Sequence, residues 1–493
     1  MDSFTLFNWA LLLMTFGLML YLGYLSSRRM RKDDAAGFLV AGRSLGAFVG
    51  AGTIVATGFS GWGFMGSPGV TYQFGAIEVL GNFFFAPAMV IAVLYFARFM
   101  QRKAIEMGSN TIPEYIGQSH GGGAMGRVLQ AVSAIITVVL LLVFLTSQIK
   151  AVGLLGASWL GIELDQSAML MVGVIILYTM LGGLAAVAWT DTIMVWGMAL
   201  AAVIIVIQML TTIDVNEWES GLNAIDPELL NPTNGAHYGA SRGNVFLVLP
   251  YAFLFAAVLP FMAIRFLAFK PEVKLHKVGI YVAVLGGLLS LIPLVGLYVR
   301  VKLPGLADPD SAMPVYLEQF MHPAIQGVIT LFIIFAMKST ANSLLHTVAS
   351  SVSHDLRLAI FAERQPSARR VLGLNRAAVL VLGVLALLMM LYAPPFMLSW
   401  LGILGTGTLL ASLIGPVFIS TFWQGSAWGA LAAMLGGFFT SGYMMLFADV
   451  GWLIGPLTGC VVSSALYIGV TLVGRSHRAH ARHPNASLPD HPA

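Results

Sequence analysis

Long apolar runs with few charges recur along this chain, and they restrict its fold more than any other feature. Most span about 20 residues or more, the length that crosses the hydrocarbon core of a bilayer. Backbone amides and carbonyls in hydrocarbon must pair within their own segment, so such runs form helices, and the alternating segments of a membrane barrel are absent. The sequence therefore predicts an all-α polytopic membrane protein with 13 transmembrane helices, at 6–25, 46–70, 75–97, 127–157, 166–185, 190–212, 245–269, 279–300, 324–353, 372–392, 397–421, 427–447 and 452–473.

Composition excludes several other classes of protein. Of the 493 residues, 58% are hydrophobic and 10% are charged, which does not suit a string of water-soluble domains. The net charge of +4 is too small for a nucleic-acid partner, so lipid and a small-molecule substrate are the expected partners. Cys460 is the only cysteine, which excludes an intramolecular disulfide, a cysteine metal site and a redox pair.

The positions of Lys and Arg predict how the chain is oriented. Cytoplasmic loops collect these residues, and with an external N-terminus most of the 26 fall in inner loops, where we interpret Arg265 as a cytoplasmic anchor. We therefore expect a multi-pass protein of the cell inner membrane, with the N-terminus outside and the C-terminus cytoplasmic. The apolar stretch after Met1 and Asp2 has no basic leader, so we interpret it as a retained first span.

No loop is long enough to hold a soluble domain, so residues 1–473 are predicted to form a single transmembrane domain. The tail, residues 474–493, is polar and is predicted to be a disordered cytoplasmic segment. Its histidines are expected to be solvated, with metal binding as the alternative.

Residues 54–70, IVATGFSGWGFMGSPGV, predict a broken helix. Five glycines and Pro68 interrupt an apolar run, and Thr57 and Ser60 add hydroxyls. A break leaves carbonyls and amides unpaired near mid-membrane, which is tolerated where they line a cavity or coordinate an ion. Close helix packing through small residues is the alternative interpretation.

Residues 336–355, AMKSTANSLLHTVASSVSHD, form the most polar of the predicted spans. Its polar residues recur at steps of three and four, which places them on one helix face: Ser339, Asn342, Ser343 and His346. That face is expected to contact protein or water. A lysine near the bilayer centre costs roughly 2.5 to 3.5 kcal/mol on insertion scales, so Lys338 is expected to have an anionic partner, a wet cavity or a neutral amine.

Further polar residues lie in or beside other spans. Asp191 follows Gly182 and Gly183 at the start of a span, where it is either a functional charge or a helix cap. Glu78 begins the third span, and Gln148 and Lys150 lie in the fourth. Glu78 is interpreted either as a partner of Lys150 or Lys338 or as an interfacial charge.

Several catalytic motifs are missing from the sequence. It contains no Walker loop and no HExxH, and no pair of nucleophile and base stands out. The chain is therefore not predicted to be an enzyme or an ATP-driven pump, and transport would use an ion gradient.

Four segments of the sequence resemble the sodium:solute symporter family, which includes bacterial proline, pantothenate, acetate and sugar symporters. They are FLVAGRSLG at 38–46, SGWGFMGSPGVTYQFG at 60–75, LGGLAAVAWTDTIM at 181–194 and VLPFMAIRFLAF at 258–269. The resemblance covers nearly the whole chain, about 6–473.

The resemblance implies a leucine-transporter-type fold, in which two inverted five-helix repeats surround a site at mid-membrane. The repeats would be 46–212 and 245–421, with two extra helices over 427–473. It also implies a Na⁺ site, and no other cofactor, formed by backbone carbonyls and by hydroxyls: Ala56, Phe59 and Ala336, with Ser339 and Thr340. These are the hard oxygen ligands that such a cation prefers.

Two positions depart from the family pattern. Proline symporters have an acidic residue where Gly58 stands, although other branches of the family do not. Lys338 stands beside the Ser-Thr pair, at a position expected to be apolar. Its charge would repel Na⁺, substitute for it, couple transport to H⁺, or attract an anionic substrate.

The sequence thus predicts a secondary active transporter that imports a small organic solute by alternating access. A carboxylate or an amino acid is favoured over a sugar, because 258–277 resembles the pantothenate and acetate branches and because of Lys338. Lys338 and Asp191 are predicted to compensate charge or couple the ion. The predicted substrate contacts are Ser60, Gly61, Trp62, Glu78, Gln148, Tyr251 and Asn342. A membrane sensor that works with a separate signalling partner, and a channel, are the alternatives.

Overall fold

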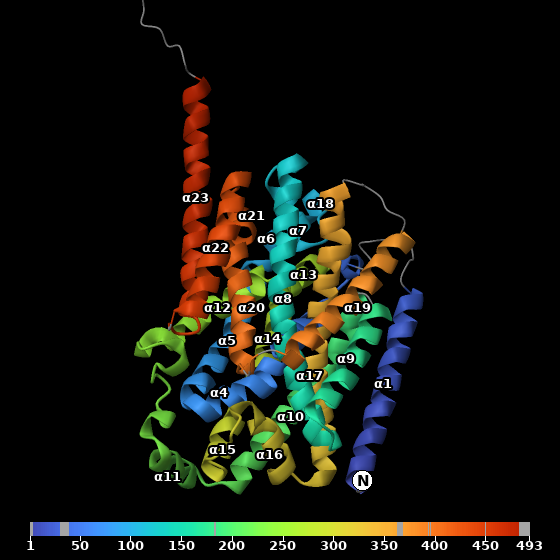
Figure 1. The fold of residues 1–493 in the computed structure, drawn as a ribbon, viewed down its shortest axis with the longest axis vertical. Helices are drawn as coiled ribbons and strands as arrows, with labels where there is room; N and C mark the ends of the chain where they lie inside the picture. The colour runs from blue at the N-terminus through green and yellow to red at the C-terminus, as the bar shows by residue number, and fades with distance from the viewer. Residues whose placement is uncertain are drawn as a thin grey trace, which may run out of the picture.

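The computed structural model describes residues 3–29, 39–181, 184–361, 368–392, 394, 396–448 and 450–482. Within these residues the chain is helical and has no strand, and a single isolated bridge pairs Leu45 with Phe269. Most of the long helices lie side by side along the long axis of the molecule (Figure 1). The predicted all-α membrane fold is confirmed.

Each predicted run coincides with a helix or a broken pair of helices. The long elements are α1 (Ser3–Arg29), α3 (Ala47–Gly58) with η2 (Trp62–Gly66) and α4 (Ser67–Phe74), α5 (Ala76–Tyr95), α8 (Gly123–Leu160), α9 (Leu164–Leu181), α10 (Leu184–Thr212), α12 (Val248–Val258) with α13 (Pro260–Ala268), α14 (Leu275–Leu289) with α15 (Leu294–Lys302), α17 (Pro323–Ser350) with η7 (Ser351–Leu356), α19 (Ala368–Tyr392), α20 (Leu398–Leu413) with η8 (Ile414–Ile419), α22 (Ala427–Phe447) and α23 (Ile454–Arg482).

Shorter helices connect these elements. They are η1 (Ala41–Arg43), α6 (Ala97–Met107), α7 (Ile112–Ser119), α11 (Val215–Ile225), η3 (Pro227–Leu230), η4 (Ala236–Tyr238), η5 (Arg242–Leu247), η6 (Pro309–Ser311), α16 (Ala312–Phe320), α18 (Arg357–Phe361) and α21 (Ser420–Phe422).

Fewer helices are long and apolar enough to cross a membrane than there are apolar runs in the sequence. Among the described residues, nine helices are long and apolar enough to cross a membrane, or up to 11 if each of two bent pairs counts as one span. The runs at 6–25 and 166–185 contain shorter apolar helices, Ser3–Leu18 and Leu164–Met180. The count of 13 stays a prediction.

The helix over 47–74 is broken, as predicted. Its two halves, Ala47–Gly58 and Trp62–Phe74, are bent by 48°. The amide of Gly61 donates to Gln148 Oε1 at 2.9 Å and the amide of Trp62 donates to Ser60 Oγ at 3.1 Å, in place of carbonyls one turn back. A Cβ on Gly61 would lie 2.8 Å from that Gln148 oxygen, so glycine allows this close approach.

A second break separates α12 from α13, and sequence analysis did not predict it. The halves Arg242–Val258 and Pro260–Ala268 are bent by 57°. Pro260 lacks an amide hydrogen and is the first residue of the second half, while Leu259 before it is extended. Proline therefore ends one helix and begins the next.

Burial separates central helices from peripheral ones. The apolar windows of the α17 and α20 spans are 83% buried, whereas those of α19 and α23 are 28% buried. The polar face predicted for 336–355 is buried within the protein, because Ser339, Asn342 and Ser343 are all nearly inaccessible. Cys460, in α23, is buried as well.

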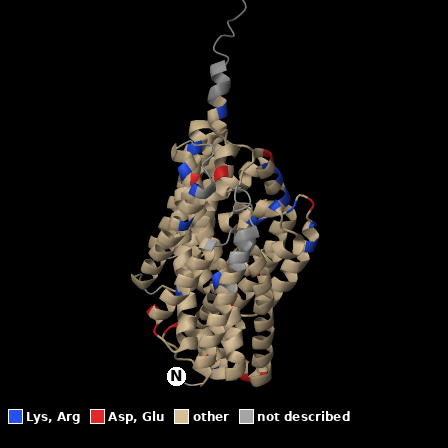
Figure 2. Ribbon diagram, turned by 90° about the vertical axis from the view of Figure 1, so that its right-hand side faces the viewer, with Lys and Arg blue, Asp and Glu red and all other residues tan. Residues whose placement is uncertain are grey.

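Charges are unevenly placed along the molecule. Figure 2 shows the Lys and Arg of the described residues mostly in the half from which α23 projects, with the N-terminus at the opposite end. α23 continues to Arg482, so the helix extends beyond the predicted boundary at 473 into the predicted tail. Residues 483–493 lie outside the described residues, as do 30–38.

The contact between α7 and α23 is expected to make the stability of the folded protein depend on pH. His120 lies 7% exposed at the end of α7, with Nδ1 2.8 Å from the Ile116 carbonyl and Nε2 2.7 Å from Tyr467 Oη. A carbonyl only accepts, so Nδ1 donates to it and Nε2 of the neutral ring accepts from Tyr467. Burial lowers the pKa of His120 from 6.5 to about 4.

The unfolded chain therefore binds this proton at a higher pH than the folded chain does. The stability contribution of the neutral ring is complete above about pH 6.5 and is lost as pH falls toward 4, by up to about 3 kcal/mol. Thermal unfolding in detergent at pH 7.5 and 5 measures it. His120→Gln is expected to lose less stability on acidification than the native chain, and the exposed-site variant His276→Gln is expected to behave as the native chain. Equal losses in all three would contradict this assignment.

Candidate functional site

The break after α3 meets the polar face of α17. Thr340 Oγ1 donates to the Thr57 carbonyl at 3.1 Å and lies 3.5 Å from the Ala336 carbonyl. Ser339 Oγ is fully buried and lies beside the Asp191 carboxylate, without a well-formed hydrogen bond to any described residue. The end of α3 and the segment of α17 from Ala336 to Thr340 thus place carbonyl and hydroxyl oxygens in one buried region.

These oxygens fit a small hard cation. All five predicted Na⁺ ligand residues are at most 2% exposed: Ala56, Phe59, Ala336, Ser339 and Thr340. The Ser339 hydroxyl can donate to Asp191, while its oxygen accepts no hydrogen bond from a described residue, and a cation is one group that would bind that oxygen. The carbonyl of Thr57, which the Gly61 amide does not bind, contributes a further oxygen to the same region.

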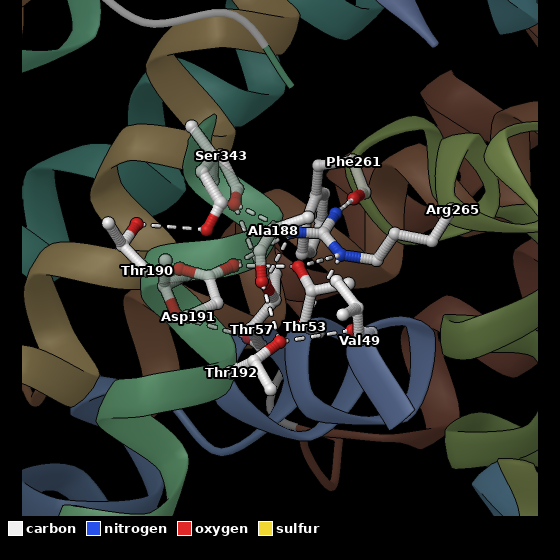
Figure 3. A network of polar contacts seen from close by, with 12 residues as sticks. Val49, Thr53, Thr57, Ala188, Thr190, Asp191, Thr192, Phe261, Arg265 and Ser343 are labelled. Carbon is white, nitrogen blue, oxygen red and sulfur yellow. Dashed lines mark hydrogen bonds and ion pairs between the residues drawn. The ribbon is translucent and has the colours of Figure 1, made fainter. Parts of the chain in front are cut away.

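Next to this region lies a buried network of charged and hydroxyl groups (Figure 3). Asp191 Oδ2 accepts a hydrogen bond from Thr53 Oγ1 at 2.7 Å and lies 3.7 Å from Arg265 Nη2. Arg265 Nη2 also donates to the hydroxyls of Thr57 and Ser343. The network therefore joins α3, α10, α13 and α17 inside the membrane domain, and among the described residues Asp191 is the carboxylate that pairs with Arg265.

The interpretation of Arg265 as a cytoplasmic anchor is wrong. Its side chain is 0% exposed, Nε donates to Thr53 Oγ1 at 3.1 Å, and Nη1 donates to the Phe261 carbonyl. Arg265 lies in the last turn of α13, near a helix end as the sequence suggested, but its side chain faces α3 rather than the aqueous side. The alternative for Asp191, a simple helix cap, is wrong for the same reason, since its carboxylate binds other helices.

Lys338 is also buried, at 1% exposed, and its Nζ lies 3.9 Å from the centre of the Tyr178 ring. A lysine over the face of an aromatic ring is attracted to the negative π surface. Tyr178 Oη is hydrogen-bonded to Thr190 Oγ1 at 2.7 Å. The carboxylate whose negative charge acts on Lys338 is that of Asp191. Its role as the partner of this lysine stays a prediction.

A pocket opens beside the break. The space that its lining leaves free for water-sized groups is about 30 Å³. The lining has aromatic, glycine and polar residues: Gly58, Phe59, Trp62, Gly63, Ser67, Glu78, Gly81, Asn82, Phe85, Tyr238, Val248, Tyr251, Ile403 and Leu453. Three of the seven predicted substrate contacts, Trp62, Glu78 and Tyr251, line this pocket.

Glu78 is the acidic residue of the pocket and has four hydrogen-bonding neighbours. Its Oε1 accepts from Ser67 Oγ and Asn82 Nδ2, both at 2.7 Å. Its Oε2 accepts from Tyr238 Oη at 2.7 Å and lies 3.2 Å from His237 Nε2. The interpretation of Glu78 as a lysine partner or an interfacial charge is wrong, because it is 3% exposed and bound by the loop between α11 and α12.

The other predicted contacts lie outside the pocket lining. Gln148 and Gly61 bond to each other at the break, and Ser60 accepts the Trp62 amide. Asn342 Oδ1 accepts from Thr179 Oγ1 at 2.9 Å and so faces α9. Their role in binding substrate stays a prediction.

Lys150 pairs with Asp310, with Nζ 2.9 Å from Oδ2. Asp310 also accepts from the amide of Leu398 at 3.0 Å. Burial raises the pKa of Asp310, and Lys150 opposes that shift. This pair fixes the start of α20 against α8.

Sequence reasoning missed several residues of these sites. Thr53 is a single hydroxyl in an apolar helix, and His237 and Tyr238 lie in a polar loop far along the chain, so no local pattern marked them. Arg265 carried a signal, because its neighbours in 258–269 are part of the family resemblance.

Comparisons of the sequence with a family model and with known proteins agree on one family. The sequence model of the sodium:solute symporter family matches residues 38–437. The osmoregulated proline transporter OpuE of Bacillus subtilis is 28% identical over 430 residues, which cover 85% of each chain. The sodium/pantothenate symporter of Haemophilus influenzae is 25% identical over 413 residues, 83% of this chain and 84% of that one.

Solved structures give the same fold. A Na⁺-coupled sialic acid symporter, substrate-bound and outward-open, superposes with a TM-score of 0.75 at 17% identity, over 94% of this chain and 98% of that one. Mhp1, a nucleobase-cation-symport-1 family transporter, superposes with a TM-score of 0.56 at 16% identity, over 90% and 97% of the two chains. The fold is therefore of the leucine-transporter type.

Proposed function

Because the chain belongs to the sodium:solute symporter family, we propose that it is a secondary active transporter that imports a small organic solute together with Na⁺. The observation that carries the proposal is the contact between the broken α3 and the Ser339–Thr340 pair of α17, which gathers carbonyl and hydroxyl oxygens in a buried region. In this proposal Na⁺ is held by the carbonyls of Ala56, Phe59 and Ala336 and by those two hydroxyls.

Alternating access would use the two breaks. The first helix of each proposed repeat, 46–212 and 245–421, is the bent one. Broken helices at corresponding positions of two halves are typical of transporters whose substrate lies at mid-membrane. Rocking of these helices against the rest would open the pocket to each side in turn, with the N-terminus outside and the C-terminus cytoplasmic.

The pocket favours an amino acid over a carboxylate without an amine. Glu78 is its only charged lining residue among those described, and no Lys or Arg lines it. A substrate ammonium would bind Glu78 in place of the donors from His237 and Tyr238, and its apolar part would pack on Trp62 and Tyr251. Two of the relatives are named as proline transporters. Proline symporters have an acidic residue at the position of Gly58, and in this chain Glu78 supplies an acidic group to the pocket that Gly58 also lines.

The test is uptake into proteoliposomes under imposed gradients. With an inward Na⁺ gradient, labelled L-proline is expected to accumulate above its equilibrium level, and an equal K⁺ gradient is expected to give no accumulation. L-Proline and its N-acetyl derivative, which lacks a basic amine, are compared as competitors, with pantothenate as a carboxylate control. Accumulation driven by H⁺ but not by Na⁺ would reject the cation assignment, and inhibition by pantothenate alone would reject the amine.

Glu78→Gln tests the pocket separately from the ion. Glutamine keeps the shape but removes the charge and one acceptor, so about tenfold to hundredfold weaker substrate binding is expected, at nearly unchanged Na⁺ affinity. Substrate-induced thermal stabilisation measures it. Glu217→Gln, which changes an exposed carboxylate of α11, is the control and is expected to bind substrate as the native chain does. Unchanged binding in Glu78→Gln would remove Glu78 from the site.

A further inference from the structure

Asn82 lines the pocket beside Glu78, and its hydrogen bonds fix which end of its amide faces that residue. Nδ2 lies 2.7 Å from Glu78 Oε1, 3.2 Å from the Glu78 backbone carbonyl and 3.0 Å from Ser67 Oγ. A carboxylate and a backbone carbonyl only accept hydrogen bonds, so the amide atom that faces them is the nitrogen. The amide oxygen, Oδ1, lies on the other side and accepts no hydrogen bond from a described residue.

The hydroxyl hydrogens of the pocket are directed at acceptors within the protein. Ser67 Oγ donates to Glu78 Oε1, and Tyr238 Oη donates to Glu78 Oε2, both at 2.7 Å. Tyr251 Oη lies 2.7 Å from Thr406 Oγ1. Because Thr406 donates its own hydrogen to a backbone carbonyl at 2.6 Å, Tyr251 supplies the hydrogen of this contact.

The described lining therefore offers a substrate mainly acceptors. Apart from the indole N–H of Trp62, each side-chain donor of the lining already has an acceptor in the protein. Asn82 Oδ1 is an acceptor without a donor, and it lies next to Glu78, the charged residue among those that line the pocket. Such a lining matches a cation with several N–H groups better than a cation with none.

We propose that Asn82 determines the specificity of the pocket for amines, because its Oδ1 accepts a second N–H of the substrate ammonium while Glu78 accepts the first. This inference rests on the proposed function and narrows its substrate to amino acids whose charged nitrogen carries at least two N–H groups. A quaternary ammonium has the same charge but no N–H, so it forms neither hydrogen bond and is selected against.

The experiment compares ligands that share one ring, one carboxylate and one positive charge. The charged nitrogen of L-proline carries two N–H groups, that of N-methyl-L-proline carries one, and that of N,N-dimethyl-L-proline carries none. Substrate-induced thermal stabilisation of the purified full chain, in detergent and saturating Na⁺, gives the Kd of each ligand. For the native chain we expect one methyl group to raise the Kd by about tenfold and two methyl groups to raise it by about a hundredfold.

Variants of Asn82 separate hydrogen bonding from the bulk of the added methyl group. Asn82→Leu keeps a similar side-chain volume, Asn82→Ala leaves a space, and both remove Oδ1. Both also remove the Nδ2 bonds to Glu78, so all the ligands are expected to bind more weakly. The measured quantity is therefore the Kd of N-methylproline divided by that of proline, which is expected to fall from about 10 to about 1. If Asn82→Leu does not fold, Asn82→Ala gives this ratio.

A buried asparagine outside the pocket lining supplies the matched control. Asn375 Nδ2 donates to Ser353 Oγ at 3.1 Å, and Asn375→Ala removes that amide. The ratio of the two Kd values is expected to stay at the native value.

Three results would contradict this inference. If the Asn82 variants keep the native ratio, the methyl group is excluded by its bulk, and Asn82 does not bind the amine. If the native chain binds N-methylproline or dimethylproline as tightly as proline, Asn82 has no role in specificity, while the assignment of the substrate amine to Glu78 stands. If the native chain binds none of these ligands, the amine assigned under the proposed function is wrong, and the role of Asn82 is wrong with it.

Discussion

Replacing Asp191 by Asn is expected to lower the free energy of unfolding by about 3 to 5 kcal/mol, among the largest effects of any single substitution in this chain. Asparagine has nearly the same shape, but it leaves Arg265 and Lys338 buried without their carboxylate. An uncompensated buried charge costs more than a lost hydrogen bond. Thermal unfolding in detergent, followed by a thiol-reactive dye that reports exposure of the buried cysteine, measures the loss.

The neighbouring residue supplies a control for that variant. Thr192 Oγ1 donates to the Ala188 carbonyl at 2.7 Å, so Thr192→Val removes a buried hydroxyl of the same helix without changing charge. Its loss is expected to be about 1 kcal/mol. Equal losses for the two variants would show that hydrogen bonding, rather than charge compensation, accounts for the role of Asp191.

Removing a hydroxyl ligand of the proposed Na⁺ site is expected to raise the Na⁺ concentration for half-maximal uptake by about tenfold to hundredfold. Ser339→Ala and Thr340→Val each delete one oxygen from a buried region. Because the oxygen is deleted from a buried site, the contribution of that ligand is lost. Uptake into proteoliposomes at a series of Na⁺ concentrations measures the effect.

The matched control lies on the same helix. Thr347 Oγ1 donates to the Ser343 carbonyl at 2.8 Å, and Thr347→Val removes a buried hydroxyl away from the break. Its Na⁺ dependence is expected to match that of the native chain. A shift in Thr347→Val as large as that in Thr340→Val would mean that the helix, not a ligand, was disturbed.

The positions of the helices along the chain were predictable, because an apolar run of this length in a membrane has few alternatives to a helix. The same reasoning located the break in 54–70, since five glycines and a proline within 17 residues do not support one straight helix. It failed at Pro260, where a single proline in an apolar run gives no comparable signal, although it bends that helix by 57°.

The candidate sites were predictable only in part, because the missing information was three-dimensional. Asp191 and Lys338 were marked by the cost of burying a charge, and they do lie together. Arg265 was misassigned, because its place near a helix end does not show that its side chain faces α3 and α17. His237 and Tyr238 reach Glu78 across 159 and 160 positions of sequence, and such a long-range contact leaves no periodic pattern.

The solitary buried thiol of Cys460 makes the chain convenient for spectroscopy. Accessible thiolates attack maleimide and thiol-directed nitroxide reagents, so the background reaction of the buried Cys460 is expected to be slow without mutating it. Cysteines introduced at the exposed positions Gln73 and Ala236 would then carry a pair of spin labels, one on α4 and one on the loop that binds Glu78. Distances between the labels, with and without Na⁺ and amino acid, would report directly whether this loop lifts during the transport cycle.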